Sequence, residues 1–277
     1  MILKVFLKVF FIHLSFDFMM MICMKEWRQF FSSLTGYIAI ILFLLLMGLF
    51  LFVFPNSSIL DFGYASLDNF FSIAPWMMLF LVPTITMRSI ADAYKSGTFE
   101  ILKTLPLSPS KIVCGKYLGC LLVVAVALMP TLIYAFSIQQ LSAKGGIDAG
   151  ATAGSYIGLL MLGAVYTSVG ICTSSFTNNT VAAFILAAFV CFILYSGFNA
   201  VSKLPVFANG GDYYIQMLGL DFHYTSISRG VIDTRDVLYF LAVIFLFLLI
   251  TQRNLVRRSI DLHLKPYALN LMLYTLP

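Results

Sequence analysis

RSIADAYKSGTFEILKTLPLSPSKIVCGK, residues 88–116, is a stretch with charged side chains along its length that lies between two long apolar runs. The runs cover residues 70–87 and 117–137, and neither contains a charged side chain. A helix needs about 17–25 apolar residues to cross the hydrocarbon core of a bilayer. The stretch is therefore predicted to join two membrane-spanning helices.

The same kind of apolar run occurs six times in the 277-residue chain. None of the runs contains Asp, Glu, Lys, Arg or His; they cover residues 36–54, 70–87, 117–137, 155–176, 181–201 and 237–251. The chain is 61% hydrophobic and 10% charged, whereas soluble domains average about 25% charged residues. We predict an all-α integral membrane protein with one six-span domain over residues 36–258.

Basic residues gather on one side of this arrangement. Of the 17 Lys and Arg residues, thirteen fall inside when both termini are inside, and four fall in outer loops: Lys144, Lys203, Arg229 and Arg235. Because basic residues are retained on the cytoplasmic side of a membrane, we predict that both termini and the 88–116 stretch are cytoplasmic. Topology thus accounts for the net charge of +5, and no nucleic-acid partner is expected.

The first 23 residues, MILKVFLKVFFIHLSFDFMMMIC, form an apolar segment that is interrupted by Lys8, His13 and Asp17. The segment has no small-residue cleavage site, so a cleaved secretory signal is not expected. We interpret Met24 as the start of the native chain and residues 1–23 as an extension that packs on nothing. At the other end, residues 259–277 are expected to form a cytoplasmic tail.

Residues 24–35 (MKEWRQFFSSLT) have the spacing of an amphipathic helix. An apolar stripe repeats at i, i+3, i+4 and i+7, and it consists of Trp27, Phe30, Phe31 and Leu34. The opposite face includes the basic Lys25 and Arg28. This pattern predicts a helix in the membrane interface that enters the first span through a turn at Gly36. A frayed basic tail is the alternative.

The 88–116 stretch contains signals for a short cytoplasmic helix. Gly97 can end the extension of the second span, because glycine adopts the left-handed conformation. A helix over residues 98–105 then has Thr98, Ile101, Leu102 and Leu105 on one face and Glu100 elsewhere. Pro106 ends this helix, and Ser108-Pro109 is a typical start for the next one. The apolar face can lie on lipid or dock into a partner protein, and the spacing does not separate these alternatives.

Proline and small residues within the spans suggest bends and close packing. Pro75 and Pro83 in the second span and Pro130 in the third each remove a backbone donor. We expect Pro83 to act as a hinge because its helix leads into the 88–116 stretch. Small residues that favour helix packing, within one subunit or with a partner, are Gly154, Gly158, Ala183 and Ala187.

The spans contain no group that suits ion coupling or catalysis. A proton or sodium relay needs ionisable residues, and intramembrane catalysis needs a nucleophile with a base, a metal cluster or paired carboxylates. The five cysteines have no CxxC spacing and the three histidines are isolated, so no metal or directly bound cofactor is expected. At Gly115-Lys116 the phosphate-loop pattern fails, because Ser110 and Tyr117 stand where Gly and Ser or Thr are required.

The segment GTFEILKTLPLSPSKIVCGK, residues 97–116, resembles the region between the second and third spans of type 2 ABC transporter permeases. The resemblance rests on a Gly-Thr-x-Glu-x-Leu run, Leu-Pro and Gly-Lys, at Gly97, Thr98, Glu100, Leu102, Leu105, Pro106, Gly115 and Lys116. A second segment, SISRGVIDTRDVLYFL (residues 226–241), is similar to the stretch before the last span in the gliding-motility-associated subfamily. The family often has an acidic pair before the Gly-Thr, and here only Asp92 stands near it.

This resemblance implies a permease subunit of an ATP-driven exporter in the bacterial inner membrane, associated with gliding motility. It implies pairing with a second permease, as a homodimer or heterodimer, and with ATPase subunits that use the ATP. Membrane lipid is the other expected partner. The implied ATPase-coupling residues are Gly97, Thr98, Glu100, Ile101, Leu102, Leu105 and Pro106. The alternatives from other classes are a passive channel or scaffold and, less favoured, an intramembrane enzyme.

Overall fold

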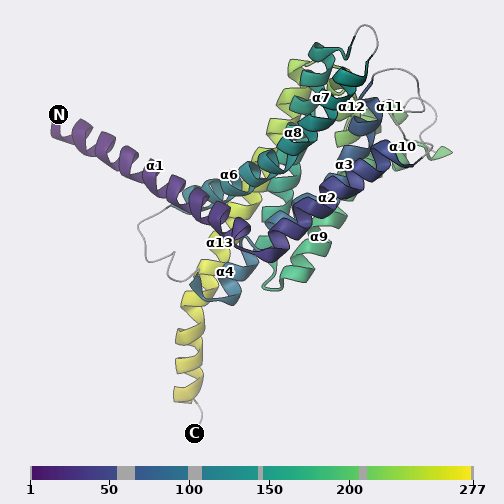
Figure 1. The fold of residues 1–277 in the computed structure, drawn as a ribbon. Helices are drawn as coiled ribbons and strands as arrows, with labels where there is room; N and C mark the ends of the chain where they lie inside the picture. Colours follow the sequence, from purple (N-terminus) through teal and green to yellow (C-terminus); the bar gives the residue numbers. More distant parts are fainter. Residues whose placement is uncertain (1, 55–65, 99–107, 143–145, 206–210, 276–277) are drawn as a thin grey trace.

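The structure is a computed structural model that describes residues 2–54, 66–98, 108–142, 146–205 and 211–275, with side chains described between residues 17 and 258. Within these residues the chain is helical, without strands, and six helices or helix pairs are long and apolar enough to cross a membrane (Figure 1). They cover Leu34–Phe52, Asp68–Lys95, Pro109–Leu141, Ala149–Phe176, Thr180–Ser202 and Thr234–Arg258. The prediction of an all-α, six-span protein is confirmed.

The long helices form a bundle, and short helices lie at both of its ends (Figure 1). The elements are α1 (Ile2–Phe31), α2 (Leu34–Phe52), α3 (Asp68–Thr86), α4 (Ala91–Lys95), α6 (Pro109–Leu128), a 3₁₀ turn (Met129–Thr131), α7 (Leu132–Leu141), α8 (Ala149–Phe176), α9 (Thr180–Phe192), a π-helical turn (Ile193–Gly197), α10 (Phe198–Ser202), α11 (Asp212–Gln216), α12 (Leu220–Ile227) and α13 (Thr234–Thr275). We call the segment between α3 and α6 the elbow. The end of the bundle with α4 is the elbow end, and the end with α11 and α12 is the far end.

Helix α8 is the centre of the bundle. It contacts α3, α6, α9, α12 and α13, and every residue from Leu162 to Ser175 is buried. A helix that is apolar or small on all sides can be surrounded by neighbours in this way. The spans that contain α3, α6, α9 and α13 therefore share α8 as their common packing partner, whereas α2 packs mainly on α3.

Small residues bring the neighbours of α8 close to its backbone. A Cβ at Gly170 would overlap Thr86 Oγ1 of α3, and one at Gly154 would lie 3.0 Å from Gly230 Cα. At Gly158 the neighbour is Ile227 of α12, at 2.7 Å. Ala183 and Ala187 of α9 are fully buried. The glycines of the 154–158 pair thus contact residues of the same chain.

The prolines affect their helices in different ways. Helix α3 continues through Pro75 and Pro83. The Phe71 carbonyl, which an N–H at position 75 would normally bond, accepts a hydrogen bond from Tyr224 Oη at 2.8 Å. Pro130 lies in the 3₁₀ turn that separates α6 from α7, where the third span was predicted to bend. A hinge at Pro83 stays a prediction.

Helix α1 is longer than the sequence analysis predicts. It runs without a break through residue 24 and packs along α6, with Ile22 and Cys23 buried. Gly115 and Gly119, one turn apart on α6, let α1 approach: Cβ atoms there would lie 3.0 Å from Met19 O and 2.9 Å from Cys23 O. The prediction that residues 1–23 pack on nothing is wrong for Met19, Ile22 and Cys23.

The predicted interfacial helix over residues 24–35 is divided between two helices. Helix α1 ends at Phe31, and α2 begins at Leu34 with Ser33 as its N-cap. Leu34 is therefore separated from the aromatic stripe and is 76% exposed. The turn precedes Gly36, which lies inside α2. A Cβ at this position would be 2.6 Å from Phe30 O, so the glycine lets the end of α1 approach α2 closely.

We expect Gly170→Ala to lower the free energy of unfolding by about 1–3 kcal/mol, because the added methyl group forces α3 away from α8. Thermal unfolding in detergent measures the effect. Gly48→Ala is the matched control, since a Cβ there meets only Tyr134 Oη at an ordinary 3.5 Å. Equal unfolding temperatures for the two variants would contradict the close α3–α8 contact.

Candidate functional site

The segment between α3 and α6, residues 87–108, is the elbow. Helix α3 ends at Thr86, a turn covers residues 87–90, and α4 ends at Lys95. Gly97 has a φ of 70°, and Thr98 Oγ1 lies 3.0 Å from Ser96 Oγ. The remaining predicted coupling residues lie outside the described residues: Glu100, Ile101, Leu102, Leu105 and Pro106.

A single serine of α8 holds the turn at the start of the elbow. Ser174 Oγ accepts hydrogen bonds from the N–H groups of Ile90 at 3.2 Å and Ala91 at 3.0 Å, and it donates one to Met87 O at 3.1 Å. Ser174 is fully buried. Buried backbone groups that lose their helical partners must find others. Ser174 thus fixes the turn to the central helix.

A buried ion pair holds the same turn from the other side. Lys116 Nζ of α6 lies 2.5 Å from Glu26 Oε1 of α1 and donates a hydrogen bond of 2.5 Å to Ser89 O. The side chains of Lys116 and Glu26 are 5% and 8% exposed. Through these two contacts Lys116 joins α1, α6 and the elbow. Burial, with a smaller contribution from the Glu26 charge, also raises the pKa of the nearby Cys23 thiol.

Helix α13 contacts the elbow end through two polar side chains. Asn254 Nδ2 donates to Ser175 O at 2.8 Å, and Arg258 donates to the carbonyl of Phe176 and to Asn178 Oδ1. The Arg258 guanidinium also lies 4.8 Å from the centre of the Tyr94 ring in α4. Helix α4 is thereby linked to α13 as well as to α8.

The aromatic residues of the predicted interfacial helix form a cluster beside the elbow. Trp27 and Phe31 have ring centres 4.6 Å apart, and Phe30 lies 5.4 Å from Phe31. All three rings are partly buried against the core, whereas Arg28 is exposed. The end of α1 is therefore packed onto the bundle.

Sequence reasoning missed Glu26 and the role of Lys116. Lys116 was interpreted as a topology signal, and Glu26 lies beside the basic residues of the predicted helix. A signal was present, because Glu26 is four residues from Ile22 and from Phe30, on the face that packs. An acid on the packed face of a helix predicts a buried basic partner.

A second buried pair lies at the far end. His223 Nδ1 of α12 is 2.7 Å from Asp236 Oδ1 of α13, and His223 Nε2 is 2.9 Å from Met217 O. His223 is isolated in the sequence, and the packing of α12 on α13 gives it an acidic partner 13 positions away. Asp233 accepts from Arg235 N at 3.0 Å at the start of α13, as a cap, while Asp236 turns to the histidine.

The start of the elbow is therefore attached to several helices at once. Its first turn is bonded to α8 by Ser174, to α6 and α1 by Lys116, and its short helix α4 contacts α13 through Arg258. A displacement of the elbow changes several buried hydrogen bonds at once, so the attached helices should move with it.

A family model described as ABC-2 family transporter protein matches residues 55–250. The matched region begins after α2 and covers the elbow, α8 and most of the membrane-spanning part of α13. A comparison with curated proteins gave no match.

We expect Lys116→Met to lower the free energy of unfolding by about 3–5 kcal/mol, because it leaves the Glu26 charge buried and unpaired. Adding Glu26→Gln should restore much of the loss. Thermal unfolding of the single and double variants in detergent checks both results. If the double variant loses as much free energy of unfolding as the two single variants lose in total, the pair is not coupled.

Proposed function

The chain belongs to the ABC-2 family of transporter proteins, and we propose that it is the exporting permease subunit of a complex whose energy comes from separate ATPase subunits. Membership follows from the match over residues 55–250, more than two thirds of the 277 residues. The chain is thus a multi-pass membrane subunit of an ABC transporter, and such subunits work with an ABC ATPase.

The observation that supports this proposal is the attachment of the elbow to the bundle. Ser174 bonds the first turn of the elbow at three backbone atoms, and Lys116 bonds it at a fourth, Ser89 O. We propose that the ATPase contacts residues 98–105, just beyond this turn. Closure of the ATPase would then displace the elbow and, through Ser174, the central helix α8.

The proposal extends to topology and assembly. The elbow and both termini face the cytoplasm of a bacterium, as the distribution of Lys and Arg indicates. A second permease, either a copy of this chain or a related one, completes the membrane part. The resemblance of residues 226–241, in α12 and the start of α13, supports a role in gliding motility.

We also infer that the chain hydrolyses no ATP itself. The one Gly-Lys pair of the sequence is Gly115-Lys116 in α6, and Lys116 already bonds Glu26 and Ser89 O. A phosphate-loop lysine needs a free ammonium group beside glycine-rich backbone N–H groups.

Leu102→Asp should prevent stable association with the ATPase, because it puts a charge on the apolar face proposed to dock. Co-purification of the two subunits from membranes measures this, with Thr104→Asp as the matched control on another face of the same predicted helix. Normal insertion is checked for both variants. An intact complex with Leu102→Asp would remove the docking assignment.

Ser174→Ala should leave the complex assembled and weaken the response of the far end to ATP. A cysteine placed at the exposed Ser72 of α3 reports this response through its labelling rate. We expect the ATP-dependent change to fall by about tenfold or more, because the substitution removes all three hydrogen bonds of Ser174, each contributing about 0.5–1.5 kcal/mol. Ser168→Ala is the control, since Ser168 bonds only Val165 O of its own helix. An unchanged response in Ser174→Ala would contradict transmission through this serine.

A further inference from the structure

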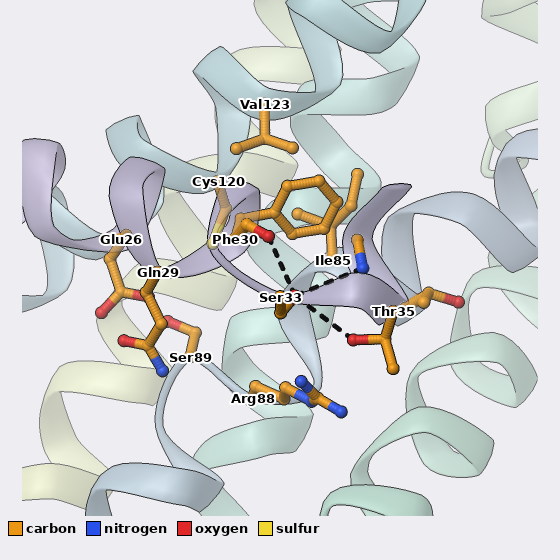
Figure 2. Close-up of a pocket in the computed structure, with 12 residues that line it drawn as sticks. Glu26, Gln29, Phe30, Ser33, Thr35, Ile85, Arg88, Ser89, Cys120 and Val123 are labelled. Carbon is orange, nitrogen blue, oxygen red and sulfur yellow. Dashed lines mark hydrogen bonds between the residues drawn. The ribbon is translucent and has the colours of Figure 1, made fainter. Parts of the chain in front are cut away.

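A small cavity lies where α1, α2 and the elbow turn meet (Figure 2). Its volume is about 40 Å³, and its polar lining includes Glu26, Gln29, Thr35, Arg88 and Ser89. The proposed coupling route uses the backbone of Ser89 and the Glu26–Lys116 pair, but not Arg88 or the Ser89 hydroxyl. The chemistry of the cavity therefore needs an explanation of its own.

The charge in the cavity lining is positive. Arg88 is half-buried, and no carboxylate among the described residues pairs with it. Glu26 also lines the cavity, but Lys116 neutralises it at 2.5 Å. The local sum of these three charges is one positive charge, which resides on a guanidinium with five donors.

Other donors lie at or next to the cavity lining. Ser89 is 4% exposed, and its Oγ has no hydrogen-bond partner among the described residues, although it lines the cavity beside Cys120. The first turn of α2, a helix of 19 residues, begins here, and its Leu34 and Thr35 N–H groups have no partner within the helix. Figure 2 shows Ser33 closing this turn: its Oγ donates to Phe30 O and accepts from Gly36 N and Thr35 Oγ1.

We propose that this cavity binds the phosphate group of an anionic phospholipid. A guanidinium, an unpaired hydroxyl and the N-terminus of a long helix are groups that recognise phosphate oxygens. A water-sized group needs about 10–15 Å³ of such volume, so the cavity holds about three of them. The non-bridging oxygens of a phosphodiester fit inside, and the rest of the lipid lies outside.

The surroundings favour a lipid over free phosphate as the source of this group. Leu34, Tyr37, Ile38 and Ile41 are between 49% and 76% exposed, and they lie in the first turns of α2, the helix whose Thr35 and Gly36 line the cavity. This helix is one of the six that can span the membrane, so acyl chains can lie along it. Free phosphate would gain nothing from that apolar surface.

Native mass spectrometry of the purified chain, offered phosphatidylglycerol or phosphatidylcholine in detergent, tests the proposal without any ATPase. We expect Arg88→Gln to lower retention of phosphatidylglycerol about tenfold, since bonds to charged groups contribute that much. Arg28→Gln is the matched control, because it removes the same charge from a residue that is exposed on α1 and does not line the cavity. Equal losses in the two variants would overturn the site and leave general attraction to the surface.

Two further arms complete the experiment. Ser89→Ala replaces an unpaired hydroxyl, so the variant should fold as the wild type does. It should retain about half as much phosphatidylglycerol, because a neutral hydrogen bond contributes less than a bond to a charged group. Full retention would contradict the proposal even if Arg88→Gln failed to fold. Excess inorganic phosphate should not displace the lipid. Displacement by phosphate would show a free-anion site and overturn the lipid assignment.

Discussion

Backbone groups that are freed where a membrane helix is interrupted must be bonded by another part of the protein, and this constraint organises the structure. The turn after α3 has its free groups bonded by Ser174 and Lys116. The carbonyl freed at Pro75 is bonded by Tyr224. In both cases the partner comes from a distant part of the sequence, so each of these two interruptions also joins two elements of the bundle.

This constraint also explains how the first turn of the elbow is held. A helix that simply continued beyond the bundle could bend without affecting its neighbours. Here the first turn cannot move without breaking buried hydrogen bonds to α8 and α6, each costly in a low-dielectric interior. The buried Glu26–Lys116 pair extends the same network to α1, which lies outside the region that matches the family.

Local patterns in the sequence predict the spans and the position of the elbow, and long-range contacts account for what they miss. Hydropathy locates six spans because each is a continuous apolar run, and Gly97 and Pro109 mark helix ends through backbone geometry alone. The sequence alone does not show that Gly115 and Gly119 of α6 form the contact surface for α1, because that contact joins residues about 90 positions apart. The partners of Ser174 are likewise more than 80 positions away, beyond any periodicity.

The central claim is that the start of the elbow moves as one body with α8. Spin labels at Lys95 of α4 and Phe176 at the end of α8, both exposed positions, measure this distance in the assembled complex. The account predicts a narrow distance distribution that is the same without nucleotide and with ATP bound. A distribution that shifts or broadens when ATP binds would show that the elbow moves independently of the central helix.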